Sequence, residues 1–170
     1  MSLTLKLNFE IKMVTYRTEP TQADINNVKE IISSSGFFQD HEIPVAIELV
    51  EERLENGVES GYHFIFVDID GRTVAYSCFG EIPCTKGSYD LYWIATHQDF
   101  RGKGVGKKLM AETMAAIAKL GGRYVYIETS SKQLYEPTRK FYENLGCSTE
   151  AILKDFYDTN DHKYIYRLGV

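Results

Sequence analysis

Hydrophobic residues recur along the chain with two periods. In residues 21–35 and 43–56 they are spaced by three and four positions, the period of an amphipathic helix, and a glycine follows each segment. The same spacing runs through residues 104–120, and Pro137 suits the first turn of a shorter helix that reaches Asn144. The sequence therefore predicts four helices.

Other segments are rich in β-branched and aromatic residues over six to ten positions, which is typical of strands. The clearest is a hairpin over residues 62–81, whose two strands flank the turn signal Asp70-Gly71. The other predicted strands are 13–18, 89–96, 123–130, 147–155 and 162–168. The order β-α-α-β-β-β-α-β-α-β-β predicts one α/β domain over residues 1–170, with a mixed, mostly antiparallel sheet of about seven strands and about four helices packed on it. Residues 1–12 are expected to be extended or partly foreign to the natural chain.

Composition narrows the classes of partner. Of 170 residues, 44% are hydrophobic and 25% charged, as in ordinary globular proteins. The net charge of -5 disfavours nucleic acid as a partner, because phosphate contacts need a basic face. No apolar run approaches a membrane span, and the first residues lack the pattern of a signal peptide. We therefore expect a cytoplasmic protein with no membrane partner.

Cysteine and histidine do not follow a metal-binding pattern. Cys78, Cys84 and Cys147 are odd in number and lack ligand spacing, which argues against a disulfide scaffold and a structural zinc site. The four histidines likewise have no metal-ligand spacing. We expect no metal cofactor.

The segment DFRGKGVGKKLM, residues 99–110, is the strongest local signal. It fits neither a dinucleotide fingerprint, which would need a glycine in place of Lys107, nor a P-loop, which would need a glycine in place of Arg101 and Ser or Thr in place of Lys108. Unpaired N–H groups at a helix start nevertheless attract anions, and glycines let a phosphate approach them closely. The alternative is a tight strand-to-helix turn with solvated lysines.

Two motifs give the chain a family resemblance. The segment IATHQDFRGKGVGKKLM, residues 94–110, resembles the acyl-CoA-binding segment of the GNAT superfamily of N-acetyltransferases, with Arg101, Gly104 and Gly106 at the positions of its Q/R-x-x-G-x-G/A signature. The segment FYENLG, residues 141–146, resembles the aromatic-Tyr-Glu-x-x-Gly helix end of the same family. The resemblance spans roughly residues 60–168. Within it, the segments DLYWIA, ETSS and PTRKFYENLG together are similar to one bacterial-type branch of the superfamily.

The resemblance implies an acetyl-CoA-dependent N-acetyltransferase, in which a primary amine attacks the thioester directly in a ternary complex. It implies that the glycine loop holds the pyrophosphate of coenzyme A and that the preceding strand presents its backbone to the pantetheine arm. Tyr135 stands where the family often has Asn, and we expect it beside the cofactor. The implied cofactor-binding residues are Ile94, Ala95, Thr96, Arg101, Gly102, Lys103, Gly104, Val105, Gly106 and Tyr135.

The resemblance also assigns catalytic roles. Tyr142 occupies the family's general-acid position and is expected to hydrogen-bond the departing sulfur; from position alone it would be a packed helix residue. Glu128 and Asp90 are the candidates for the general base, and each is equally explicable as a strand-end charge in solvent. We prefer Glu128, because the family's corresponding strand end lies near the thioester.

The acceptor stays open. An acidic stretch over residues 48–59 could recruit a cationic acceptor, although such runs are usually solvated helix faces. A small-molecule amine and a peptide acceptor are both compatible with the sequence, and so is a homodimer, since many relatives are dimers. Two other functions are weighed against the enzyme: a catalytically idle acyl-CoA sensor and a nucleotide-binding module. The family's tyrosine at position 142 favours the enzyme over the sensor.

Overall fold

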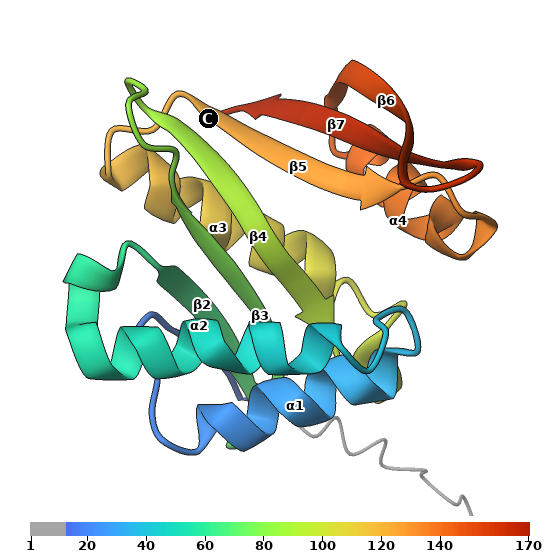
Figure 1. The fold of residues 1–170 in the computed structure, drawn as a ribbon. Coiled ribbons are helices and arrows are strands. Elements are labelled where there is room, and N and C mark those ends of the chain that lie inside the picture. Colours follow the sequence, from blue (N-terminus) through green and yellow to red (C-terminus); the bar gives the residue numbers. More distant parts are fainter. Residues whose placement is uncertain (1–12) are drawn as a thin grey trace, which may run out of the picture.

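Seven strands form one continuous sheet in the order β1-β2-β3-β4-β5-β7-β6 (Figure 1). The computed structural model describes residues 13–170, so the expectation for residues 1–12 lies outside the described part. Within it, only β4 and β5 run parallel, and every other neighbouring pair is antiparallel. The predicted mixed sheet is confirmed. Its strands are β1 (Val14–Arg17), β2 (His63–Ile69), β3 (Arg72–Glu81), β4 (Ser88–Thr96), β5 (Tyr124–Ser130), β6 (Ser148–Asp158) and β7 (Asp161–Gly169).

The helices cover both faces of this sheet, α1 and α2 on one face and α3 and α4 on the other (Figure 1). Gly36, with φ of 68°, ends α1 in the left-handed conformation that favours glycine. No helix in residues 13–170 is long and apolar enough to cross a membrane. The predicted order of strands and helices is confirmed. The helices are α1 (Asp24–Ser35), α2 (Glu42–Asn56), α3 (Val105–Lys119) and α4 (Glu136–Asn144).

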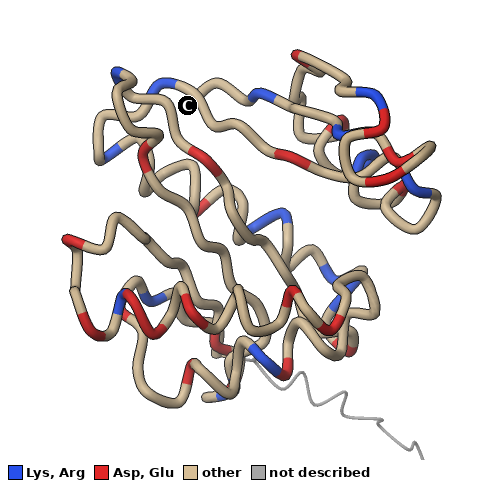
Figure 2. Tube along the Cα trace, in the orientation of Figure 1, with Lys and Arg blue, Asp and Glu red and all other residues tan. Residues whose placement is uncertain are grey.

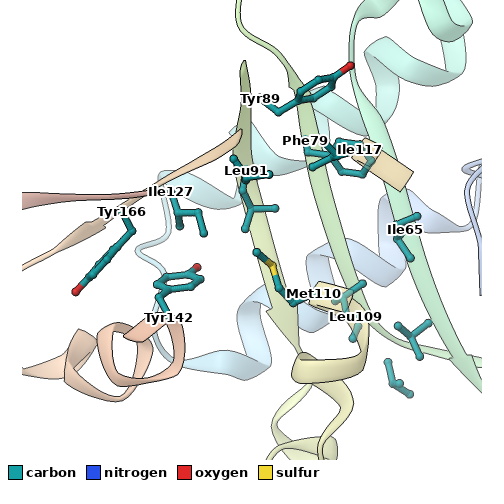
Figure 3. Close-up of a cluster of buried hydrophobic side chains, with 14 residues drawn as sticks. Ile65, Phe79, Tyr89, Leu91, Leu109, Met110, Ile117, Ile127, Tyr142 and Tyr166 are labelled. Carbon is teal, nitrogen blue, oxygen red and sulfur yellow. The ribbon is translucent and has the colours of Figure 1, made fainter. Parts of the chain in front are cut away.

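Alternation along the strands divides the buried side chains into two cores. In β2, Phe64 and Phe66 pack towards α1 and α2, whereas Ile65 and Val67 belong to the cluster under α3. Figure 3 shows part of this second cluster, in which α4 contributes Tyr142. The sheet is therefore held from both sides, and its middle strands form a rigid support for the elements at their ends.

A buried ion network fixes the start of α1 to the sheet. Asp24 is 0% exposed, and its carboxylate accepts hydrogen bonds from both terminal nitrogens of Arg17, at 2.7 and 2.5 Å. It also accepts from the backbone of Thr21 and the side chain of Asn27, at 2.7 and 2.9 Å. Arg17 in turn reaches Asp68 of β2 at 2.8 Å. Burial alone would raise the pKa of Asp24, but these hydrogen bonds outweigh it and the pKa is lowered.

We expect Asp24→Asn to lower the free energy of unfolding by about 3 kcal/mol at neutral pH, because it removes the fully buried carboxylate and leaves the half-buried Arg17 guanidinium paired with Asp68 alone. Since the folded pKa of Asp24 is depressed, its contribution is present above the ordinary value of 3.8 and is lost as pH falls through the lower folded value. Urea unfolding at neutral pH and at about pH 3 measures this, and the gap between wild type and variant should narrow in acid. The exposed Asp40→Asn serves as a control. An equal gap at both pH values would contradict the assignment.

Candidate active site

The two parallel strands of the sheet separate soon after they begin. Residues Ser88–Leu91 of β4 pair with Tyr124–Ile127 of β5, after which β4 continues to Thr96 and β5 to Ser130 without pairing to each other. Figure 1 shows the two strands diverging towards their carboxyl ends. A β-bulge accompanies the separation: Phe79 of β3 pairs with Leu91 and Cys78 with Trp93, so Tyr92 has no partner there.

A cleft of about 1070 Å³ opens between the separated strand ends. Its walls are the ends of β4 and β5, the loop into α3, the start of α4, the α1–α2 loop and the β6–β7 turn. Most of the predicted cofactor-binding residues lie together in this cleft. They are Ile94, Ala95, Thr96, Arg101, Gly102, Gly104, Val105, Gly106 and Tyr135.

Lys103 is the predicted cofactor residue that does not line the cleft. Its ammonium group donates to the carbonyl oxygen of Asp99 at 2.7 Å, and its side chain borders a separate small groove beside Val14 and Tyr16. Lys107 lines the cleft instead. The positive side chains nearest the loop inside the cleft are therefore Arg101 and Lys107.

The start of α3 carries a run of free donors. Among the described residues, none accepts a hydrogen bond from the backbone amides of residues 102–107, and the first satisfied amide is that of Lys108, which donates to Gly104 at 3.1 Å. Gly102 and Gly104 have φ of 69° and 79°, the left-handed conformation that occurs in turns whose successive amides bind anions. No acidic residue stands in the first turn of α3. The loop and helix end thus fit a phosphate group, with the helix dipole adding to the attraction.

Gly106 leaves room beside these amides. A Cβ atom built there would lie 3.7 Å from the hydroxyl oxygen of Thr96 and 3.8 Å from the ring of Phe141, which is ordinary van der Waals contact. The glycine therefore keeps open a space between β4 and α4, at the level where the free amides face the cleft.

Tyr142 points from α4 towards the strands β4 and β5 (Figure 3). It is 4% exposed and lines the cleft, yet its hydroxyl makes no hydrogen bond with any described residue. Burial, and next the neighbouring Cys147 and Tyr166, raise the pKa of this hydroxyl well above its ordinary value. At neutral pH Tyr142 therefore holds its proton and offers an unused donor to whatever occupies the cleft.

The two candidate bases differ in position. Glu128 lines the cleft, and one of its carboxylate oxygens lies 2.5 Å from the ammonium group of Lys163. Asp90 lies on the paired part of β4, opposite Tyr126, and does not line the cleft. Burial and then the charge of Glu128 raise the pKa of Asp90, while Lys163 lowers it. The structure thus places Glu128, and not Asp90, at the cleft surface.

The α1–α2 loop bridges the cleft, a feature that the sequence reading missed. The hydroxyl of Tyr135 donates to the carbonyl oxygen of Phe37 at 2.7 Å, and the guanidinium of Arg101 lies 4.5 Å from the centre of the Phe37 ring. Tyr135 therefore has a structural partner across the cleft. The signal was present as two adjacent phenylalanines, Phe37 and Phe38, in an otherwise polar segment between helices.

Most of the acidic stretch of α2 is a solvated face, as such runs usually are. Glu48, Glu51 and Glu55 are exposed and lie outside the cleft, whereas Glu42, at the start of α2, lines it. Further carboxylates come from the β6–β7 turn, where no motif had marked them. No group of three His, Cys, Asp or Glu side chains suited to a metal ion occurs within residues 13–170.

Comparison with known proteins agrees with this geometry. Residues 60–146 match the acetyltransferase (GNAT) domain. The crystal structure of a protein from Desulfovibrio desulfuricans assigned to the GNAT acetyltransferases is 43% identical, with a TM-score of 0.91 over 92% of this chain and 99% of that one. No sequence among the curated proteins matches the chain.

More distant structures share the fold. The ribosomal-protein-S18-alanine N-acetyltransferase of Escherichia coli is 18% identical, with a TM-score of 0.72 over 93% of this chain and 94% of that one. The PaiA N-acetyltransferase of Thermoplasma acidophilum, solved with coenzyme A, is 16% identical, with a TM-score of 0.72 over 93% and 99%. The chain belongs to the GNAT family of acetyltransferases, which confirms the predicted family and the predicted class, an acetyl-CoA-dependent N-acetyltransferase.

Gly106→Ala should weaken cofactor binding without lowering the stability of the fold. The added methyl group fits without a clash and favours the helix, so we expect the melting temperature to stay level or rise. The same methyl group fills the space beside the free amides, and loss of one hydrogen bond to a charged phosphate weakens coenzyme A binding on the order of tenfold. Calorimetric titration and thermal unfolding measure the two effects. Gly169→Ala, at an open position near the end of β7, is the matched control; unchanged affinity in Gly106→Ala would place the phosphates elsewhere.

Proposed function

We propose that the protein transfers the acetyl group of acetyl-CoA to a primary amine by direct attack in a ternary complex. One observation carries the proposal: residues with free backbone amides, 102 and 104–107, line the same cleft as Tyr142, whose hydroxyl is unpartnered. An anion site and a proton donor so placed suit a thioester whose phosphates and sulfur belong to one molecule. Because Cys78, Cys84 and Cys147 are all free thiols, we place the reaction in a reducing compartment such as the cytoplasm.

Acetyl-CoA supplies the activated acetyl group, and the chain's residues hold it. The amides of the glycine loop would bind the pyrophosphate, with Arg101 and Lys107 adding positive charge nearby. Because β4 has no partner strand beyond Leu91 on the side of β5, the backbone of residues 94–96 would pair with the amides of the pantetheine arm as an added strand. A free N–H of this strand would donate to the thioester oxygen and stabilise the negative charge that develops there.

The attacking amine must first lose a proton. An alkyl ammonium has a pKa of about 10.4, so only about one molecule in 2,500 is neutral at pH 7. Glu128 would accept the proton, directly or through a water molecule, with the oxygen that Lys163 does not hold. The nitrogen lone pair then forms the new bond to the acetyl carbon. As the tetrahedral intermediate collapses, the carbon–sulfur bond breaks and its electron pair leaves on sulfur.

Tyr142 would act on the leaving sulfur. A thiol has a pKa of about 8.5, well below that of the buried Tyr142 hydroxyl, so complete transfer of the phenolic proton to the thiolate is uphill. Tyr142 therefore stabilises the developing thiolate mainly as a hydrogen-bond donor. When the carbon–nitrogen bond forms, the nitrogen becomes positively charged and gives up a second proton. The leaving thiolate takes up this proton to become a thiol, while the first proton, accepted by Glu128, is released to solvent.

We expect Tyr142→Phe to lower kcat about 100-fold, since the ring keeps its packing while the donor to sulfur is lost. The affinity for coenzyme A and the melting temperature should stay near wild type. Thiol release under saturating acetyl-CoA measures the first quantity, and calorimetry the second. Tyr166→Phe, which removes a neighbouring phenol outside the cleft, is the control. Equal kcat in Tyr142→Phe and wild type would remove Tyr142 from the mechanism.

Glu128→Gln and Asp90→Asn distinguish the two bases. A base works only when deprotonated, so kcat/KM falls as pH drops through its pKa. We expect Glu128→Gln to lose about 100-fold in kcat/KM and the acidic limb of the profile with it, while Asp90→Asn keeps both the limb and most of the activity. If Asp90 were the base, the limb would lie above the ordinary aspartate range, because its pKa is raised, and would vanish in Asp90→Asn.

A further inference from the structure

We propose that the acceptor is a small oligoamine: the reacting primary amine is accompanied by at least one further ammonium group and by no carboxylate. The inference rests on the proposed function, because it concerns the acceptor half of the same cleft. It is carried by the distribution of charge and aromatic side chains along the cleft, together with the closure of one wall.

The cleft has two ends of opposite charge. At the start of α3 it is lined by Arg101, Lys107 and the free amides, with no carboxylate in the first turn of the helix. At the ends of β5 and β6 the lining carries carboxylates, and Figure 2 shows acidic positions on β5 and around the β6–β7 turn. The carboxylates that line this end are Glu42, Glu128, Asp158 and Asp161.

Two of these four carboxylates already have a cation. Glu128 is held by Lys163, and Asp161 lies 3.3 Å from the ammonium group of Lys132. Glu42 and Asp158 form no ion pair with any described residue.

In each of the two remaining carboxylates, one oxygen accepts a hydrogen bond from a nearby backbone amide. Glu42 accepts from Gln39 and Asp158 from Thr159, both at 2.7 Å. The second oxygen of each is left without a partner among the described residues. The acceptor end therefore has two more carboxylates than ammonium groups, and a cation entering it would balance them.

Aromatic side chains also line the cleft. Phe38 and Trp93 lie with ring centres 5.1 Å apart, and Tyr92 and Tyr157 complete the aromatic lining. Faces of such rings attract ammonium groups, most strongly where water is partly excluded. Burial and then the charges of Glu128, Asp161 and Glu42, among others, raise the pKa of Tyr157 to about 12, so its hydroxyl stays neutral beside these carboxylates.

An unpartnered donor marks where the reaction would occur. The hydroxyl of Tyr142 is unpartnered in the described structure, lies on a side chain that is 4% exposed, and faces the cleft. An amine reacting beside it would still lie on the same cleft as Glu42 and Asp158, which leaves those carboxylates to a second ammonium group. A carboxylate on the acceptor would meet like charge there, which disfavours simple amino acids.

The bridge across the cleft favours a small acceptor over a polypeptide. The hydrogen bond from Tyr135 to Phe37 joins the turn before α4 to the α1–α2 loop, although the two residues are 98 positions apart in the sequence. A flexible oligoamine can pass this bridge, whereas a folded protein surface would have to displace it.

The test measures thiol release from acetyl-CoA by the full chain with 1,4-diaminobutane, butylamine, 4-aminobutanoate and a short lysine-containing peptide. We expect kcat/KM for the diamine to exceed that for butylamine about tenfold at low salt, and 4-aminobutanoate to be the poorest of the three small amines. Because the Debye length shrinks to about 8 Å at physiological ionic strength, the diamine advantage should decrease as salt rises.

Two variants locate the effect. Asp158→Asn and Glu42→Gln keep an oxygen for the local backbone hydrogen bond and remove the charge, and each should raise KM for the diamine about three- to tenfold, with a smaller rise for butylamine, which has no second ammonium group. Glu51→Gln makes the same charge change on the solvent face of α2 and should alter neither substrate.

The outcomes test the oligoamine acceptor separately from the proposed acetyl transfer. Equal kcat/KM for diamine and butylamine would overturn the oligoamine acceptor and leave the acetyltransferase intact, and so would a clear preference for the peptide. No thiol release with any amine, despite coenzyme A binding, would remove the proposed transfer and the acceptor with it.

Discussion

The four-residue length of the parallel pairing between β4 and β5 is the constraint on which the rest of this site depends. A sheet normally satisfies its backbone by continuing the ladder, and ending it early leaves strand edges that need water or a ligand. The bulge at Tyr92 removes one residue of β4 from the register with β3 as the strands part. Tyr142 and Phe141 of α4 border the resulting space, and the opposite face of the sheet is packed by α1 and α2. The opening between β4 and β5 is thus held in place by the helices that pack around it.

The free amides at the start of α3 are a second place where backbone groups go without a protein partner, and packing of the helix against the core compensates for them. Leu109, Met110 and Ile117 are at most 1% exposed and anchor α3 against the sheet, so the first turn is held in place although its donors have no protein partner. Glycines at 102 and 104 take the left-handed conformation that such a turn requires. Binding of a phosphate would therefore order little new structure, because the donors are already aligned by a helix that packing has fixed.

Most of the fold and the glycine-loop end of the candidate site could be predicted from the sequence. The carboxylates that the β6–β7 turn brings to the cleft could not. Hydrophobic periodicity gave the helices and strands, and the glycine spacing marked the start of α3. Lys103 and Lys107 could not be told apart, since side-chain direction in a left-handed glycine loop does not follow a regular period. Periodicity could have placed Glu51 on the solvent face of α2, opposite the buried Ala46 and Val50. Asp158 and Asp161 could not be foreseen, because a turn between two later strands brings them to the cleft.

Opposite charge at the two ends of one cleft would also order the two proposed substrates. Coenzyme A is a polyanion at its phosphate end, so it would meet Arg101, Lys107 and the amides of α3 at one end and be repelled from the carboxylates at the other. An ammonium-bearing acceptor would experience the reverse. The same field that selects each partner would therefore point the thioester and the amine towards each other near Tyr142, before any contact specific to the reacting atoms forms. Lys163 limits this field locally by pairing with Glu128, so that the proposed base would be held in place while Glu42 and Asp158 would keep their attraction for a cation.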